Sequence, residues 1–130
     1  MADYFTKLSF GFTGKTEELA ALSAALHSPE TALTPQEIEH FDLDPDFLYL
    51  DLDHAIEGET LCIWSESSPN LDLLAHLVKR FCPSSLPVSF QYSWDCTKPR
   101  LDAFGGGACV ITKDEVRFKT TNDLVGEMLS

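Results

Sequence analysis

The alternation of apolar and polar positions predicts where this chain forms strands and helices. Apolar side chains at every second position in residues 8–12 indicate a half-buried first strand. Leucines three and four positions apart then predict a helix over 16–27, which Pro29 ends. The sequence TPQE at 34–37 combines a capping threonine, an early proline and a glutamate three residues after the cap, so we expect a short helix there.

The middle of the chain predicts a hairpin and a second main helix. FLYLDLD at 47–53 and TLCIWSE at 60–66 flank a turn-forming Glu-Gly pair, so we expect two paired strands. Apolar residues at helical spacing over 71–81 predict a helix opened by Ser68 and Pro69.

The last third of the chain predicts three strands. PVSFQYSWDC at 87–96 alternates most regularly of all, and we expect it to be a central strand. ACVIT at 108–112 and EVRFKT at 115–120 predict a C-terminal β-hairpin, with a short helix after it.

The order of these elements predicts an α+β fold. The first six main elements match the split βαβ, or ferredoxin-like, arrangement, in which an antiparallel sheet carries two main helices on one face. The C-terminal β-hairpin and short helix add to this unit. With 130 residues, 44% hydrophobic content and no linker or repeat, the chain predicts a single domain over 1–130.

Nothing in the sequence directs the chain to secretion or to a membrane. The first residues lack a basic start and a long apolar run, and no stretch approaches the ~20 apolar residues of a membrane helix. We therefore expect a cytoplasmic protein. The four cysteines show no C-x-x-C pair, so we expect reduced and mostly buried thiols, namely Cys62, Cys82, Cys96 and Cys109.

Charge is distributed unevenly along the chain. The net charge is −12, and no lysine or arginine lies between Lys15 and Lys79, a segment that holds fourteen of the 21 acidic residues. All four histidines lie there too, and we expect the carboxylates to raise their pKa. Because phosphate binding depends on clustered Lys and Arg, this composition argues against direct nucleic acid binding.

The stretch PRLDAFGGGACVIT at 99–112 is one candidate site. A phosphate loop or dinucleotide fingerprint runs into a helix, whereas these glycines precede a predicted strand. We expect them to mark a bend before the final hairpin, where a bulge, a positive φ or close backbone packing calls for glycine. The alternative is an anion contact formed by Lys98, Arg100, Gly105, Gly106 and Gly107.

The acidic stretch at 42–53 is a second candidate site. It has Asp at positions 1, 3, 5 and 12 of a calcium loop, but Phe47 stands where that loop requires glycine. Asp51 and Asp53 with His54 or His40 are the alternative metal ligands. We expect instead a solvated strand face, with no metal and no cofactor. No cysteine or serine has the setting of a nucleophile, so we predict no catalytic residue.

Two stretches carry a resemblance to a known group of proteins. SWDCTKPRLDAFGGGACVIT at 93–112 and ADYFTKLSF at 2–10 resemble small uncharacterised proteins carried on bacterial plasmids and other mobile elements. The element order also resembles plasmid-borne ferredoxin-like domains. The resemblance implies no catalytic role for its signature, which is matched by Thr97, Lys98, Pro99, Arg100 and Gly105–Gly107. The acidic middle of the chain departs from the group.

These observations favour a non-enzymatic protein-interaction module. We expect its partner to be a basic surface of another protein. An origin on a mobile element implies that this partner is a nucleic-acid-binding protein of host defence. The chain would then inhibit its partner as an anti-CRISPR or anti-restriction DNA mimic. The alternative is a small anion- or nucleotide-binding protein or a metal-dependent enzyme. The expected binding face is acidic and consists of Glu37, Glu39, Asp42, Asp44, Asp46, Asp51, Asp53, Glu57 and Glu59.

Overall fold

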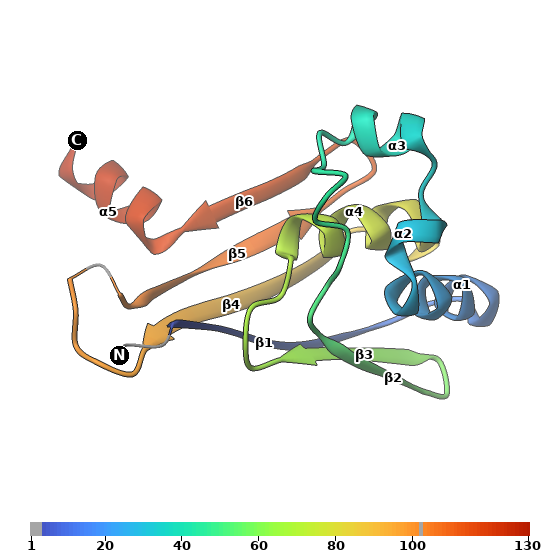
Figure 1. Ribbon diagram of the computed structural model, residues 1–130, viewed down its shortest axis with the longest axis horizontal. Helices are drawn as coiled ribbons and strands as arrows, with labels where there is room; N and C mark the ends of the chain where they lie inside the picture. The colour runs from blue at the N-terminus through green and yellow to red at the C-terminus, as the bar shows by residue number, and fades with distance from the viewer. Residues whose placement is uncertain (1–3, 102) are drawn as a thin grey trace.

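An open antiparallel sheet of six strands organises the structure (Figure 1). The computed structural model describes residues 4–101 and 103–130. The strands lie in the order β2-β3-β1-β4-β5-β6, and their bounds are β1 Tyr4–Thr13, β2 Asp53–Glu57, β3 Thr60–Ser65, β4 Val88–Cys96, β5 Gly105–Ile111 and β6 Val116–Thr120. The helices are α1 Thr16–His27, α2 Pro29–Ala32, α3 Pro35–His40, α4 Leu71–Phe81 and α5 Thr121–Leu129, with a 3-10 turn, η1, at Pro83–Ser85.

The hydrophobic core lies between the sheet and helices α1 and α4, which pack against each other on one face (Figure 1). Strand alternation supplies the sheet side of this core, because every second residue of a strand points to the same face. The opposite face of the sheet is mostly polar, with Trp64 and Val110 as exposed apolar residues on it. Fully buried leucines from both helices fill the core, namely Leu19, Leu22, Leu73, Leu74 and Leu77.

The predicted helices form close to their expected bounds. The Thr34 hydroxyl accepts from the Glu37 backbone N–H, and the Glu37 carboxylate accepts from the Thr34 N–H, which confirms the capping box of α3. Helix α4 begins later than Ser68 and Pro69, because the Asn70 side chain is the acceptor that caps it. The helix of the last segment also forms, with a capping box at Thr120.

The predicted C-terminal hairpin and the central position of β4 are confirmed, and a hairpin also forms about the predicted Glu57-Gly58 turn, although its first strand is shorter and begins later than predicted. Strands β2 and β3 pair antiparallel across a turn in which Gly58 has φ 62°, and β5 pairs with β6. Strand β4 lies between β1 and β5. The fold is therefore α+β with an open antiparallel sheet, but the six-strand order differs from the four-stranded ferredoxin-like sheet, because β5 and β6 continue the sheet beyond β4.

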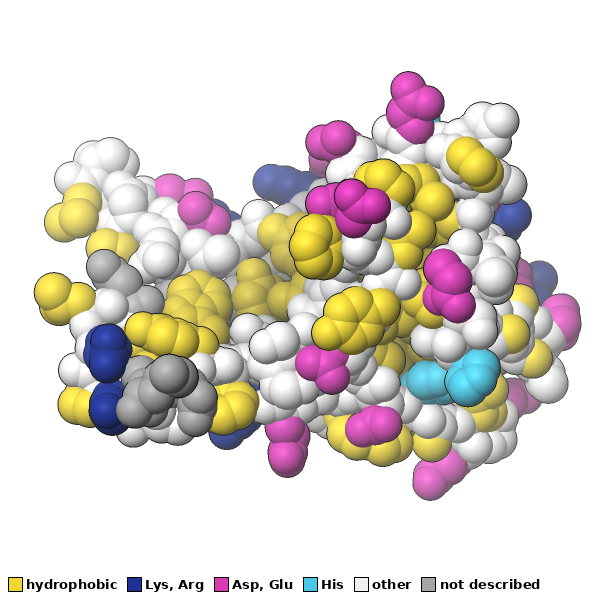
Figure 2. All heavy atoms as spheres, in the orientation of Figure 1, with side chains coloured by type: hydrophobic (Ala, Val, Ile, Leu, Met, Phe, Trp, Pro, Cys, Tyr) yellow, Lys and Arg dark blue, Asp and Glu magenta, His cyan; other side chains and the backbone are white. Residues whose placement is uncertain are grey.

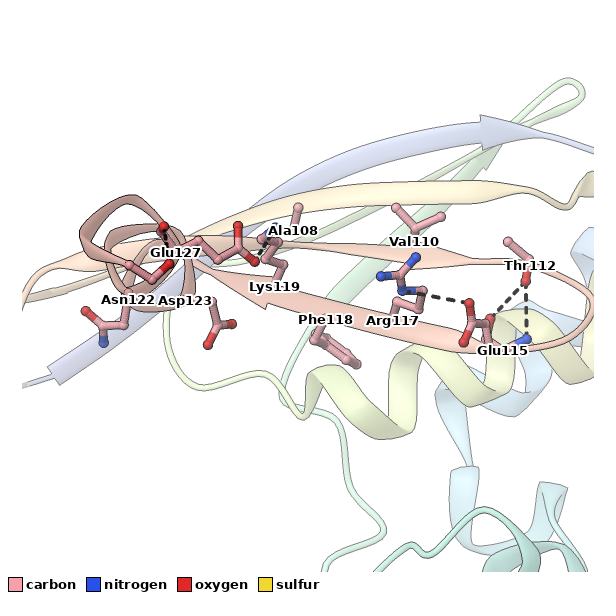
Figure 3. Close-up of a pocket in the computed structure, with 12 residues that line it drawn as sticks. Ala108, Val110, Thr112, Glu115, Arg117, Phe118, Lys119, Asn122, Asp123 and Glu127 are labelled. Atoms are coloured by element: carbon pink, nitrogen blue, oxygen red, sulfur yellow. Dashed lines mark hydrogen bonds and ion pairs between the residues drawn. The ribbon is translucent and has the colours of Figure 1, made fainter.

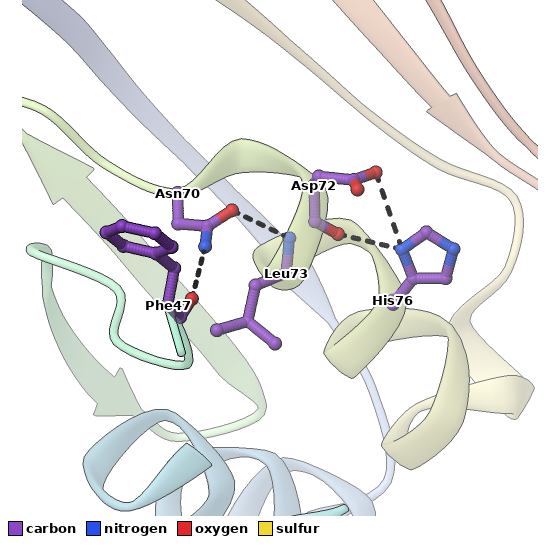
Figure 4. A network of polar contacts seen from close by, with 5 residues as sticks. All are labelled: Phe47, Asn70, Asp72, Leu73 and His76. Atoms are coloured by element: carbon purple, nitrogen blue, oxygen red, sulfur yellow. Dashed lines mark hydrogen bonds and ion pairs between the residues drawn. The ribbon is translucent and has the colours of Figure 1, made fainter. Parts of the chain in front are cut away.

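The strand predicted over 47–53 is wrong. The chain is irregular from 41 to 52, and β2 begins only at Asp53. Asn70, at the start of α4, holds this segment. Its side-chain amide donates to the Phe47 carbonyl at 3.0 Å (Figure 4), and its backbone N–H donates to the Leu50 carbonyl, also at 3.0 Å. Asp51 then adopts φ 53°, a left-handed conformation that ends the alternation before β2.

The predicted glycine bend is also wrong. Gly105, Gly106 and Gly107 lie inside β5, paired with β4, and none of them has a positive φ. A Cβ on Gly105 or Gly107 would overlap the ring of Trp94 or Tyr92, so these glycines let the two rings lie flat on the neighbouring strand. Close packing, rather than a turn, accounts for the three glycines.

Candidate functional site

The acidic residues of the predicted binding face come from α3, the 41–52 segment, β2 and the β2–β3 turn. We call these nine residues the acidic surface. Glu37 is half-buried and the other eight are exposed. Figure 2 shows Asp and Glu side chains over α3, over the 41–52 segment and beside β2 and β3, while Lys and Arg side chains lie toward the edges of the view. The fold thus leaves the carboxylates of a distinct part of the molecule open to solvent.

Three members of the acidic surface have local partners. The Arg80 Nε donates to the Glu37 carboxylate at 2.7 Å, and the Thr34 backbone N–H together with Arg80 lowers the pKa of Glu37. The Asp44 carboxylate accepts from the Asp46 backbone N–H, and the Asp51 carboxylate accepts from the Ser67 hydroxyl at 2.8 Å.

The other six members make no side-chain hydrogen bond or ion pair with any residue in the described ranges. They are Glu39, Asp42, Asp46, Asp53, Glu57 and Glu59. Carboxylates without cationic partners keep their full negative field in solution, so this surface attracts positive charge.

Two exposed aromatic residues lie within the acidic surface. Phe47 is 63% exposed and Tyr49 is 70% exposed, in the segment that carries Asp44, Asp46 and Asp51. Sequence reasoning missed both, because it placed them in a paired strand. The signal that could have found them is the aspartate on either side of FLYL, which makes this stretch acidic as well as apolar.

A shallow hollow of about 320 Å³ adjoins Tyr49. It lies between the end of α1, the start of α2 and the segment that leads into β2. Glu30, Asp51 and Asp53 contribute carboxylates to its wall, and Tyr49 contributes a ring. This combination suits a cationic side chain, because a guanidinium or ammonium group is attracted both by carboxylates and by an aromatic face.

His54 does not follow the expectation drawn from local charge. Burial lowers the pKa of His54, with a further lowering from His27 and only a partial opposing effect of Asp53. His54 lies on β2 with its Nδ1 3.4 Å from the Ser23 hydroxyl oxygen. The prediction of a raised pKa is wrong here because sequence reasoning did not foresee that α1 covers this ring.

The metal alternative gains no support from the geometry. Within residues 4–101 and 103–130, no three His, Cys, Asp or Glu side chains gather as a metal-binding group. Asp51 and Asp53 line the same hollow, but they do not share a strand, because Asp51 has φ 53° and β2 begins at Asp53.

The cysteines are reduced, as predicted, and three of the four are buried. Burial raises the pKa of Cys82 and of Cys109 to about 12, with small further contributions from Glu18 and Asp72. The pKa of both thiols therefore lies well above neutral pH, which is typical of structural rather than reactive cysteines.

The residues of the predicted anion contact lie partly in a loop and partly in a strand. Lys98 and Arg100 are exposed in the connection between β4 and β5, whereas the glycines are in the sheet. The Gly106 N–H donates to the Thr121 hydroxyl at 3.3 Å. An anion contact by Lys98 and Arg100 stays a prediction.

Comparison with protein-family models, with curated proteins and with solved structures finds no match to this chain. In the part of the chain that the structure describes, no helix has the length and apolar character needed to cross a membrane.

Proposed function

We propose that this protein is a non-enzymatic interaction module whose acidic surface binds a basic surface of another protein. The observation that carries this proposal is the pair of exposed aromatics, Phe47 and Tyr49, set among carboxylates that are mostly free of cationic partners. Aromatic residues are the usual energetic centre of a protein interface, and charges around them guide the approach of the partner.

The two parts of this surface have different tasks. The carboxylates act over about 10 Å at ordinary ionic strength and accelerate the encounter with a positively charged partner. Phe47 and Tyr49 then bury apolar area at the contact, which slows dissociation. The hollow beside Tyr49 receives a lysine or arginine side chain of the partner.

We extend the proposal to a partner that itself binds nucleic acid. Such a protein offers a basic surface built for phosphates, and an exposed array of carboxylates can occupy the same positions. Inhibition of nucleic-acid-binding host defence machinery is the function in which this mimicry is useful. Duplex DNA should then compete with this protein for its partner.

We also propose that β1, α1, β2, β3, α4 and β4 form a ferredoxin-like unit within the larger sheet. The support for this is the order β2-β3-β1-β4 of its strands and the packing of α1 against α4. In this proposal β5, β6 and α5 are an addition, and the acidic surface belongs to the unit itself.

The proposal is tested by affinity capture from the cells that naturally contain the chain, followed by binding measurements with the purified partner. A triple variant, Asp42→Asn, Asp44→Asn and Asp46→Asn, removes three charges, and asparagine at 44 keeps an oxygen acceptor for the Asp46 N–H. We expect this variant to bind at least about tenfold more weakly.

The matched control removes three carboxylates outside the acidic surface. The changes Glu17→Gln, Asp114→Asn and Glu115→Gln alter the net charge equally, and these residues lie in α1 and in the β5–β6 turn. Binding by this control should stay close to wild type. Equal loss of affinity in the two variants, or no loss in either, would refute a specific acidic binding surface.

A further inference from the structure

Helix α5 presents most of its apolar side to solvent, and only Leu124 of that side borders a hollow that Tyr92 and Gly105 of the sheet also line. Leu124, Val125, Met128 and Leu129 recur on one side of the helix, and Met128 and Leu129 are each 83% exposed. None of the residues of α5 is buried. An amphipathic helix normally faces its apolar stripe inward, so this orientation needs a partner.

The polar side of α5 instead faces the sheet. Gly126, Glu127 and Ser130 line a hollow of about 1000 Å³ together with residues of β5 and β6 (Figure 3). Lys119 of β6 donates to the Glu127 carboxylate at 2.8 Å and fixes this orientation. The ion pair and the capping box at Thr120 therefore direct the apolar stripe away from the chain.

The helix side of the sheet is uncovered at the same end of the molecule. The core beneath α1 and α4 reaches as far as Tyr92 and does not include Trp94 or Phe118. Tyr92 packs against both of these rings, at centroid distances of 6.2 and 6.5 Å, which forms an aromatic floor. Figure 2 shows a hollow with apolar side chains at its base between α5 and the 41–52 segment.

We propose that this end of the molecule is a self-association surface, in which α5 of a second copy lies on the aromatic floor. The surface is self-complementary, since each copy has both an apolar helix side without a partner and an aromatic floor that no helix covers. A two-fold pair can satisfy both copies at once. The second copy then supplies the helix that this half of the sheet lacks.

The exposed area is large enough for a stable pair. We call six residues the apolar end, and at about 200 Å² for a large apolar residue they expose roughly 800 Å², the usual contribution of one partner to a stable interface. They are Leu101, Phe104, Leu124, Val125, Met128 and Leu129.

Charge also favours pairing through this end. The chain has a net charge of −12, and most surfaces of two copies repel each other. Lys98 and Arg100 are exposed beside Leu101, whereas α3 and the β2–β3 hairpin, which carry five of the nine residues of the acidic surface, lie at the other end (Figures 1 and 2). The 41–52 segment, with the other four, lies between the two ends, so pairing through the apolar end leaves the carboxylates of α3 and of the hairpin available.

Sedimentation and light scattering of the full chain over about 1 μM to about 1 mM test this proposal. We expect a mass of twice 14.5 kDa at the upper concentrations. The double variant Met128→Gln and Leu129→Gln should weaken dimerisation about a hundredfold, because two large apolar side chains leave the interface. Its thermal unfolding as a monomer should match wild type, since α5 has no buried residue.

A matched control and a second readout keep the test decisive. Ile56→Gln removes an exposed apolar side chain from the opposite edge strand β2 and should leave dimerisation unchanged. In a Trp64→Phe background, dilution should shift the emission of Trp94 to the red as the floor is uncovered. A monomer at every concentration, or a dimer that the α5 variant does not weaken, would overturn the proposal.

Discussion

At the scale of single residues, the glycines of β5 are fixed by what their neighbours require. A Cβ on Gly106 would lie 2.6 Å from the Tyr92 carbonyl oxygen, a backbone atom that cannot move without breaking the sheet. Gly126 in α5 has nothing within 4 Å of the same position. The two glycines therefore differ in kind, although sequence alone does not distinguish them.

This difference predicts opposite effects of one substitution. Gly106→Ala should lower the free energy of unfolding by about 1–3 kcal/mol, because the added methyl overpacks the β4–β5 ladder. Gly126→Ala should leave it unchanged or raise it by up to about 1 kcal/mol, because alanine favours a helix. Urea denaturation of both variants measures this, and equal stability of the two would contradict the packing described for β5.

His54 makes the free energy of unfolding depend on pH, so that the folded chain is less stable in acid. Burial lowers its pKa below the ordinary 6.5, so the unfolded chain binds the proton more readily than the folded chain. His54 thus contributes stability above about pH 6.5 that is lost as the pH falls through its lowered pKa. The carboxyl of Glu37, whose pKa is lowered below 4.5, contributes stability that is fully present above about pH 4.5 and is lost only as the pH falls further.

We expect the free energy of unfolding to fall between about pH 7.5 and about pH 5.5, and His54→Gln to reduce that fall. Urea denaturation at the two pH values is the measurement. If the variant loses as much stability on acidification as wild type, the burial of His54 is not the cause.

At the scale of elements, the sequence predicts a helix or strand best where residues close together in the chain determine it. The capping box of Thr34 and Glu37, the leucine stripes of α1 and α4 and the alternation of β4 are each local signals, and each formed as predicted. The 47–53 segment alternates as well as a strand does, but Asn70 binds two of its carbonyls. A partner 20 or more residues away is not visible in the hydrophobic periodicity of the segment.

The acidic surface shows the same limit. Its residues could be named from the sequence because charge is a local property. The exposure of Phe47 and Tyr49 depends on how 41–52 crosses α4, and the exposure of α5 depends on the Lys119–Glu127 ion pair. The exposure of the two aromatic rings and that of α5 therefore both follow from tertiary contacts, which sequence patterns do not show.

Helix α5 should behave as an element of its own. Thr120→Ala removes the side chain that caps it, at a cost of about 1 kcal/mol, so amide exchange within α5 should accelerate about fivefold. Exchange in β4 should not change, because α5 contributes no buried residue to the core. Hydrogen exchange resolved by residue tests this, and equal acceleration in β4 would show that α5 is part of the global folding unit.

At the scale of the whole molecule, the chain has two ends of different character. One end carries carboxylates around two exposed aromatics, and the other carries an unpartnered apolar helix beside an aromatic floor. If two copies pair through the apolar ends, each pair presents two acidic surfaces. A partner with repeated basic sites would then be bound more tightly than by one copy.

The most direct test of the central claim is the salt dependence of binding to the captured partner. Affinity should fall steadily between about 50 and about 500 mM salt. The variant with asparagine at 42, 44 and 46 should show a shallower fall than the control variant changed at Glu17, Asp114 and Glu115. An affinity that is constant across this range, or an equal salt dependence of the two variants, would contradict an acidic binding surface.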